Sequence, residues 1–278
     1  MEEKNIAGFP EFLAKGAGEI LMDSSRRIKS RKGEPGNFAT DADMESERFL
    51  ISAVLKKFPR HAIMSEETRN KIKKPETLPS LWIMDPLDGT SNFFYGIPIF
   101  AASIAYAEFG KVIAGAIYDP NRGEMFSARI GEGSYLNKKK IRVWDKGFSG
   151  TLANIGSPYK RTDFLKCQPL LDKVYAKEAR TRNLGSAALE IAYVACGRFS
   201  YYFDWGCRPW DVAAGSLIIS EAGGKTEYFG GKNFFDAKGF AFSPKNPMIK
   251  QPVRANKPPR GKTSRQSAKL TGNRGSSG

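Results

Sequence analysis

The chain has 278 residues, of which 41% are hydrophobic and 26% charged, and it carries a formal net charge of +15. This length and composition are typical of a globular protein with one large domain or two packed subdomains, and the positive charge suits an anionic substrate. No apolar run approaches the roughly 20 residues that cross a bilayer, and the charged N-terminus lacks the apolar core of a signal peptide. We therefore expect a cytoplasmic protein with no membrane partner.

The N-terminal half is predicted to begin with two helices and to continue as a sheet. Residues 5–29 carry a helical stripe of apolar side chains, and a second helix is expected between Thr40 and Pro59, with a loop at residues 31–38 between them. From residue 81 to 143, short β-rich segments alternate with turn residues, which predicts mainly antiparallel strands. These segments are residues 81–84, 101–109, 111–119, 124–130 and 139–143.

Residues 144–250 are predicted to form a second unit that mixes strands and helices. Residues 151–156 and 198–205 are typical of strands, whereas residues 184–197 and 211–224 are typical of helices that end in glycine. The expected division is therefore 1–143, 144–250 and a tail at 251–278. That tail carries seven lysines and arginines, no acid and few large apolar residues, so we expect it to be disordered.

The cysteines and the histidine limit the kinds of active site that the chain can form. Cys167, Cys196 and Cys207 lack the Cys-x-x-Cys spacing of a zinc or redox site, and we expect buried or inert thiols. His61 is the one histidine, which argues against a His-rich zinc site and a Ser-His-Asp triad. Acid–base work would then fall to carboxylates, hydroxyls or a metal-bound water.

The stretch WIMDPLDGTSNF places two acids, Asp85 and Asp88, directly after an apolar strand. Burying charge there is costly unless the charge is paired or bound to a metal. The strand is expected to end at Met84, Pro86 is expected to stop regular pairing and fix a turn, and Thr90 and Ser91 are expected to cap a short helix. Free amides at a helix start suit a phosphate, and the acids suit a hard cation that binds phosphate oxygens.

Two further apolar elements also meet acids. Glu66 and Glu67 follow the run HAIM, and Asp211 begins an apolar helix. Taken singly, each of these is explained as well by a solvated strand end or a helix cap. Taken together, Asp85, Asp88, Asp211 and one of the two glutamates would form an all-oxygen site, which selects Mg²⁺ or Mn²⁺ over zinc.

At this point the sequence resembles a known family. DPLDGTSNF at residues 85–93, together with WDVAAGSLIISEAGG at 210–224, resembles the two signatures of the inositol monophosphatase family, and TDAD at 40–43 and LGSAA at 184–188 match in order and spacing. The resemblance covers roughly residues 5–245. It implies a metal-dependent, lithium-sensitive phosphatase of sugar or polyol phosphates. The implied fold is α+β, a layered αβαβα sandwich with a mainly antiparallel N-terminal sheet, usually in a homodimer.

The resemblance also implies a ligand set for two or three Mg²⁺ ions, with Mn²⁺ as a substitute. Glu66 and Asp85, with the Leu87 carbonyl, resemble the ligands of a first metal. Asp85, Asp88 and Asp211 resemble the ligands of a second, and Glu66 would also bind a third, weaker one. The metals would offset phosphate charge and acidify a water that attacks phosphorus.

Further roles are implied for the residues around these acids. Thr90, paired with Asp43, resembles the pair that orients the attacking water, so the implied catalytic set is Thr90, Asp43, Glu66 and Asp85. The implied substrate contacts are Asp88, Gly89 and Thr90 at the phosphate side, Gly185, Ser186 and Asp204 at the polyol, and Arg182, beside Arg180, for a second phosphate. Solvated basic residues beside a strand explain the two arginines equally well. Glu67 is not assigned a ligand role.

Several alternatives stay open. The most favoured substrate is inositol 1-monophosphate, and related enzymes also handle fructose 1,6-bisphosphate and 3′-phosphoadenosine 5′-phosphate or NADP(H). An aspartyl nucleophile is disfavoured, because phosphatases of that kind have two acids separated by one residue, whereas two residues separate Asp85 from Asp88. A different class of function is an RNA-linked regulatory module, in which the basic tail binds nucleic acid in a salt-sensitive way. The chain also departs from the family after residue 245, where prolines replace an expected closing helix.

Overall fold

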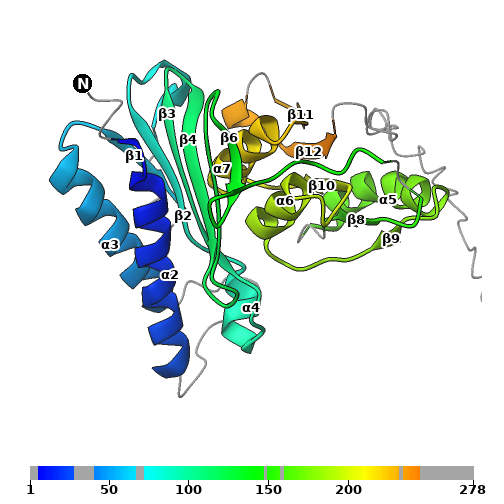
Figure 1. Cartoon of the computed structure of the whole chain (residues 1–278), viewed down its shortest axis with the longest axis horizontal. Coiled ribbons are helices and arrows are strands. Elements are labelled where there is room, and N and C mark those ends of the chain that lie inside the picture. Colours follow the sequence, from blue (N-terminus) through cyan, green and yellow to red (C-terminus); the bar gives the residue numbers. More distant parts are fainter. Residues whose placement is uncertain are drawn as a thin grey trace, which may run out of the picture.

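The computed structural model describes residues 6–27, 41–66, 72–146, 149–156, 160–231 and 234–244. Across these residues, no helix combines the length and apolar character needed to cross a bilayer. The described chain forms five layers in the order helices, sheet, helices, sheet, helix (Figure 1). This confirms the predicted α+β layered sandwich.

The first sheet follows the chain order β1-β2-β3-β4-β5-β6-β7. β1 is parallel to β2, and each later pair of neighbours is antiparallel. The predicted, mainly antiparallel N-terminal sheet is therefore present. Its strands span Ala62–Ser65 (β1), Leu81–Asp88 (β2), Ala101–Glu108 (β3), Lys111–Asp119 (β4), Glu124–Arg129 (β5), Gly133–Leu136 (β6) and Lys139–Lys140 (β7).

The second sheet has the order β11-β12-β10-β8-β9 and mixes both directions. β8 is parallel to β9 and β10, whereas β12 is antiparallel to β10 and β11. Its strands span Leu152–Ile155 (β8), Arg180–Thr181 (β9), Tyr201–Trp205 (β10), Gly224–Phe229 (β11) and Gly239–Pro244 (β12).

Helices cover both outer faces and fill the space between the sheets (Figure 1). The helices α2 and α3 lie on the outer face of the first sheet, α6 and α7 lie between the sheets, and α5 covers the far face of the second sheet. Two single 3₁₀ turns, η1 and η2, sit in connections. The helices span Phe9–Arg27 (α2), Asp41–Lys57 (α3), Thr90–Tyr95 (α4), Arg161–Tyr175 (α5), Ala187–Ala195 (α6) and Pro209–Glu221 (α7), and the 3₁₀ turns span Pro75–Thr77 (η1) and Phe234–Asp236 (η2).

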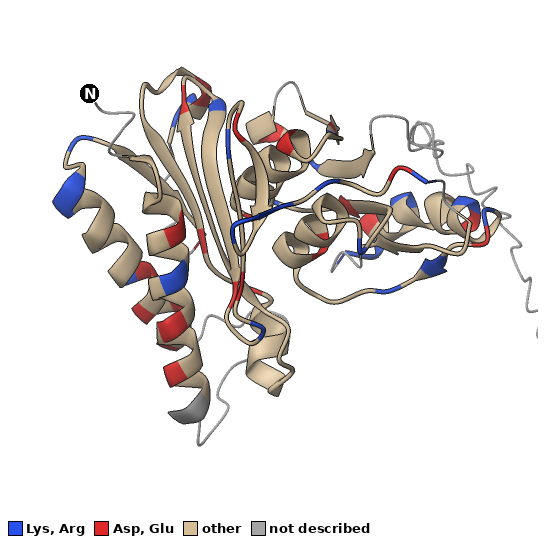
Figure 2. Cartoon of the chain, in the orientation of Figure 1, with Lys and Arg blue, Asp and Glu red and all other residues tan. Residues whose placement is uncertain are grey.

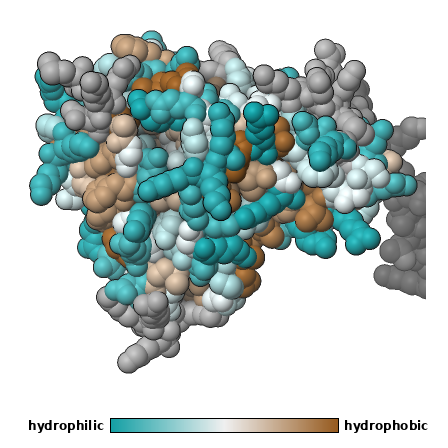
Figure 3. Space-filling model, in the orientation of Figure 1, coloured by the Kyte–Doolittle hydropathy of each residue, from teal (hydrophilic) through white to brown (hydrophobic). Residues whose placement is uncertain are grey.

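Burial on both faces explains the apolar run that opens β2. Leu81 and Ile83 pack into the core that contains α6 and α7, whereas Trp82 and Met84 pack into the core under α2 and α3. Side chains alternate across a strand, so both faces must be apolar when both are covered. On the molecular face in Figure 3, hydrophobic residues form separate patches, as expected when most apolar surface lies between the layers.

The middle helices approach their neighbours closely because small residues lie at the contacts. A Cβ on Gly115 of β4 would come within 3.1 Å of the Ala214 Cα in α7. A Cβ on Gly215 of α7 would come within 2.6 Å of the Ile191 Cγ2 in α6. The sequence of α7 is apolar almost all round because a helix between two sheets has little solvent-facing surface.

Two local predictions in the acidic stretch are wrong. The strand does not end at Met84, since β2 continues to Asp88. Its regular pairing with β3 is interrupted between Asp85 and Asp88, as expected beside Pro86. A proline lacks a donor, and an irregularity of this kind accommodates that loss. The cap of α4 is Gly89, at a φ of 94°, rather than Thr90 or Ser91, which lie inside the helix.

Other elements were not predicted from the sequence. The helix α5 contains Pro169, which disfavours a helix interior, and the strands β6 and β11 are short or polar. The predicted strand at residues 139–143 is reduced to Lys139–Lys140. The predicted loop at 31–38 and the tail at 251–278 lie outside the described residues, and the three-part division stays a prediction.

The histidine and the cysteines are structural, as expected. His61 Nδ1 accepts a hydrogen bond from Trp82 Nε1 at 3.1 Å, and its ring stacks on Phe58. All three cysteines are free thiols, and burial raises the pKa of each, to about 12 for Cys167. A raised pKa keeps a thiol protonated and unreactive.

The close crossing of α6 and α7 gives a stability prediction. Gly215→Ala should destabilise the protein, because overpacking of about 1–3 kcal/mol at Ile191 exceeds the roughly 1 kcal/mol that alanine gains over glycine in a helix. Urea denaturation measures the change, with Ser220→Ala on the exposed side of α7 as the control. An unchanged or raised unfolding midpoint for Gly215→Ala would show that the helices separate without cost.

Candidate active site

Three carboxylates from three separate elements meet at one end of the first sheet. Glu66 follows β1, Asp85 lies in β2, and Asp211 lies in the first turn of α7. One carboxylate oxygen from each lies within 4.8 Å of the others. Figure 2 shows acidic positions around this end of the sheet, near α4.

The strand register explains why the acids converge. β1 and β2 are parallel, and Ser65 pairs with Met84. The next residue along each strand, Glu66 after β1 and Asp85 within β2, therefore lies at the same end of the sheet. Asp85 in turn pairs with Ser103 of β3. The Ser103 hydroxyl donates to the Trp210 carbonyl at 3.4 Å, which ties the start of α7 to the same edge.

The cluster is electrostatically unfavourable by itself. Burial raises the pKa of Asp85 well above its usual range, and the negative charges of Glu66, Asp88 and Asp211 raise it further. Burial also raises the pKa of Asp211 well above its usual range, and the negative charge of Glu66 raises it further. Asp85 is 1% exposed and accepts one N–H bond, from Leu87 at 3.0 Å, while Asp211 accepts one from Arg208 at 2.6 Å.

These observations fit a hard divalent cation. The donors are carboxylate oxygens from three elements, close enough to share one ion, and Mg²⁺ and Mn²⁺ prefer oxygen ligands. A cation placed among the three oxygens would offset the repulsion that raises the carboxyl pKa values. The residues present therefore fit the metal that the sequence predicts.

Asp88 lies nearby but faces a different element. Its carboxylate accepts hydrogen bonds from the Ser186 hydroxyl, from Ala187 N–H at 3.2 Å and from Ala188 N–H at 2.9 Å, at the start of α6. Burial raises the pKa of Asp88 to about 6 although these bonds lower it. Oδ2 accepts two of these bonds and Oδ1 accepts one, so Oδ1 keeps a lone pair, and the predicted role of Asp88 as a metal ligand stays a prediction.

The predicted water-orienting pair is brought together. Thr90 Oγ1 lies 3.5 Å from the Asp43 carboxylate and 3.0 Å from the Leu87 carbonyl oxygen. Asp43 is 2% exposed, in the first turn of α3. A second bond joins α3 to this edge, because the Ser46 hydroxyl donates to the Pro86 carbonyl at 3.1 Å.

The residues predicted to contact the substrate come from both sheets. A Cβ on Gly89 would lie 2.9 Å from the Ile99 carbonyl oxygen, so only glycine fits there. Gly185 has a φ of 75° and is exposed, while Ser186 is buried and caps α6 by accepting the Leu189 N–H. Ser186 also bonds Asp88, so the start of α6 is linked directly to β2.

Asp204 faces the same region from β10. Its Oδ2 accepts the Tyr202 hydroxyl at 2.9 Å, and its Oδ1 has no hydrogen-bond partner among the described residues. A Cβ on Gly156 would lie 2.1 Å from the Asp204 carboxylate, so a glycine makes room for this acid. Its negative charge raises the pKa of Asp88 and Asp211, which places it close to the acidic cluster.

Arg182 is not linked to the cluster by any contact within the described chain. Its side chain is exposed and donates to the Thr181 carbonyl at 2.7 Å. Arg180 is also exposed. The predicted contact of these arginines with a second phosphate stays a prediction, and Glu67 lies outside the described residues.

Sequence reasoning missed two residues beside the site. Asn92 of α4 donates to the Leu184 carbonyl at 2.7 Å, and Glu190 of α6 accepts the Leu184 N–H. A signal for Glu190 was present, since this acid stands alone inside the apolar run of α6. Asn92 offers no such signal, because its partner is 92 residues away.

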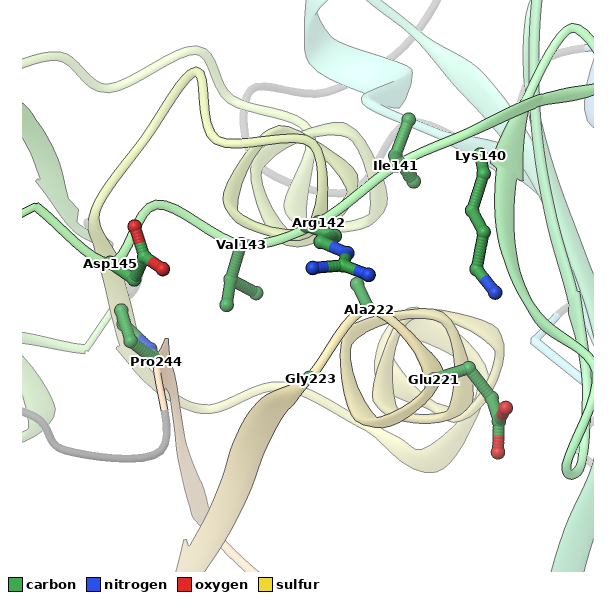
Figure 4. Close-up of a pocket in the computed structure, with 9 residues that line it drawn as sticks. All are labelled: Lys140, Ile141, Arg142, Val143, Asp145, Glu221, Ala222, Gly223 and Pro244. Atoms are coloured by element: carbon green, nitrogen blue, oxygen red, sulfur yellow. The ribbon is translucent and has the colours of Figure 1, made fainter.

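A separate hollow of about 460 Å³ lies at the C-terminal end of α7 (Figure 4). It is lined by residues 140–143, Asp145, residues 221–223 and Pro244, and it includes none of the predicted site residues. The Glu221 carboxylate accepts hydrogen bonds from the N–H groups of Gly131 and Gly133, each at 2.9 Å. We do not assign the chemistry of the carboxylates to this hollow.

Comparisons with known proteins agree with this geometry. Nus factor SuhB of Pasteurella multocida is 35% identical over 243 residues, which cover 86% of this chain and 90% of that protein. The crystal structure of the extragenic suppressor protein suhB from Bartonella henselae matches with a TM-score of 0.77 and 31% identity, over 88% of this chain and 95% of that one.

A named phosphatase has the same fold. Inositol monophosphatase from Anabaena matches with a TM-score of 0.71 and 29% identity, over 87% of this chain and 92% of that one. The sequence pattern that defines the inositol monophosphatase family matches residues 3–264. The chain therefore belongs to the inositol monophosphatase family.

Proposed function

We propose that the protein is a Mg²⁺-dependent phosphatase of small sugar or polyol phosphates, with inositol 1-monophosphate as the first candidate substrate. The observation that carries the proposal is that carboxylate oxygens of Glu66, Asp211 and the buried Asp85 lie within 4.8 Å of one another. Family membership and the structural match to an enzyme named inositol monophosphatase support it. Fructose 1,6-bisphosphate and 3′-phosphoadenosine 5′-phosphate or NADP(H) are the alternative substrates.

The residues that would hold the metal are the three clustered carboxylates, with Asp88 and the Leu87 carbonyl beside them. When bound, Mg²⁺, or Mn²⁺ in its place, supplies positive charge that offsets the phosphate charge and makes nearby water more acidic. Thr90 and Asp43 would then orient a water toward phosphorus: the Thr90 oxygen accepts a hydrogen bond from that water while its own hydroxyl donates to Asp43 or to the Leu87 carbonyl. The buried Asp43 fixes the direction of this hydroxyl.

The setting proposed for this activity is a homodimer in the cytoplasm, and it rests on the resemblance to the family. A second candidate function is a regulatory role beside catalysis. The observation that favours it is the name of the similar proteins, Nus factor SuhB. A regulatory role that involves RNA through the basic tail would be independent of the carboxylates, so Asp85→Asn separates the two functions.

The first prediction from this proposal concerns metal dependence. Phosphate release should require Mg²⁺ or Mn²⁺ and stop with EDTA. Asp85→Asn should lower kcat/KM by roughly a hundredfold or more, because several kcal/mol of charge stabilisation are lost. A panel of the candidate phosphate esters measures this, with circular dichroism as the control for folding. Near-wild-type turnover in Asp85→Asn would contradict the proposed mechanism.

A second prediction concerns pH. In EDTA, carboxyls with raised pKa values hold protons that the unfolded chain has released, so wild-type stability should fall as pH rises above about 4 through the raised pKa of Asp85. In Asp85→Asn, the unfolding free energy should fall less steeply with pH than in wild type, by up to about 1.4 kcal/mol per pH unit for one proton. Urea denaturation between pH 5 and 8 measures it, and exposed Asp172→Asn is the control. Parallel slopes for wild type and Asp85→Asn would contradict the electrostatic reading of the cluster.

A third prediction concerns Thr90 and Asp43. If they orient the attacking water, Thr90→Ala and Asp43→Asn should each lower kcat by on the order of a hundredfold with little change in KM, and the double variant should lose little more. If they only stabilise helix ends, each should cost about 1 kcal/mol of stability and leave kcat intact. A double-mutant cycle in kcat and unfolding free energy decides, and additive stability losses at unchanged kcat would refute the catalytic role.

A further inference from the structure

Both backbone polar groups of Leu184 are hydrogen-bonded to side chains. Its N–H donates to the Glu190 carboxyl, and its carbonyl accepts Asn92 Nδ2 at 2.7 Å. Leu184 directly precedes Gly185 and Ser186, which are the residues proposed to contact the alcohol part of the substrate. The two hydrogen bonds therefore hold the two peptide groups on either side of Leu184, directly before the residues proposed to contact the alcohol.

Asn92 connects this segment to the phosphate side of the site. It lies in α4, two residues after Thr90, and its second N–H donates to the Ile99 carbonyl at 2.8 Å. Gly185 lies directly against it, since a Cβ on Gly185 would be 3.1 Å from Asn92 Nδ2. The side chain thus bridges α4 and the segment before α6 with both of its donors used.

Glu190 is an unusual residue for its position. It is 2% exposed, in the first turn of the apolar helix α6, where an apolar side chain would avoid the cost of burying a carboxyl. Burial raises its pKa to about 8, so the neutral acid is the main form at pH 7. The side chain of Asn154, 1% exposed, faces it. A neutral carboxyl and a glutamine offer the same carbonyl acceptor to Leu184.

We propose that Asn92 and Glu190 are positioning residues that clamp the Leu184 backbone and thereby set the affinity of the site for the alcohol part of the substrate. Neither is proposed to touch the phosphate. This inference rests on the proposed phosphatase function. It attributes the preference for polyol phosphates to the two hydrogen bonds that hold Leu184, next to Gly185 and Ser186.

The arrangement predicts a selective defect. The clamped segment connects β9 to α6, whereas the clustered carboxylates come from β1, β2 and α7. Release of the segment should misplace Gly185 and leave the carboxylates in register. A displacement of about 1 Å at a contact can cost roughly a hundredfold. The defect should therefore appear with a polyol phosphate and be small with phenyl phosphate, whose leaving group has no hydroxyls to hold.

The test compares Glu190→Leu, which removes the acceptor, with Glu190→Gln, which keeps it. For Glu190→Leu, the ratio of kcat/KM for inositol 1-monophosphate to that for phenyl phosphate should fall about 10- to 100-fold, mainly through KM. For Glu190→Gln the ratio should stay within about threefold. Asn92→Leu should resemble Glu190→Leu. Val194→Ala, a cavity at the other end of α6, controls for general loosening of the helix.

A structural readout accompanies the kinetics. Amide hydrogen exchange at residues 183–186 should accelerate in Glu190→Leu and Asn92→Leu, and stay as in wild type in Glu190→Gln. If exchange accelerates while the substrate ratio is unchanged, or if Val194→Ala shifts the ratio equally, the proposal is wrong. Should the wild type hydrolyse no ester, calorimetric binding of inositol 1-monophosphate against inorganic phosphate replaces the kinetics, with weaker binding of the ester alone expected in Glu190→Leu. Failure of the phosphatase function and failure of the clamp thus give different results.

Discussion

Mutual repulsion among Glu66, Asp85 and Asp211 is the constraint on which the site depends. Their oxygens lie within 4.8 Å of one another, Asp85 is 1% exposed, and the pKa values of both aspartates are raised. Such an arrangement costs free energy, and it persists only because the surrounding fold fixes each carboxylate independently. β1 and β2 fix two of them through parallel register, and α7 delivers the third.

The packing of α6 and α7 in the middle layer fixes the position of Asp211. α7 is buried between two sheets and crosses α6 at a glycine, so it cannot shift its N-terminus away from the carboxylates without opening the core. The same layer brings the start of α6 to Asp88 through Ser186. Asp211, the proposed metal ligand, and Ser186, a proposed contact for the alcohol, thus lie at the starts of neighbouring helices of one layer. The hydrogen bond from Asn92 to Leu184 joins that layer to α4.

Much of the fold and part of the site followed from local pattern. The alternation of apolar and turn residues predicted β3 to β5 close to their observed bounds and the start of β2, and glycines marked the ends of α6 and α7. Local rules failed where tertiary contacts compensate for them. Pro86 stays in a strand because the register shifts beside it, Pro169 stays in α5 because that helix packs on the second sheet, and Gly89 replaces Thr90 as the cap because the Ile99 carbonyl lies against it.

The sequence by itself determined which groups carry the chemistry. The acids at the ends of apolar runs, the lack of other histidines and the two matching signatures indicated an all-oxygen metal site in a phosphatase family, because ligand type follows from residue type. Only the tertiary structure decided which of these groups meet. It grouped Glu66 with Asp85 and Asp211, turned Asp88 toward α6, and brought Asn92 and Glu190 to the backbone of one residue, Leu184. Those outcomes depend on strand register and helix packing between residues up to about a hundred positions apart, which no local pattern records.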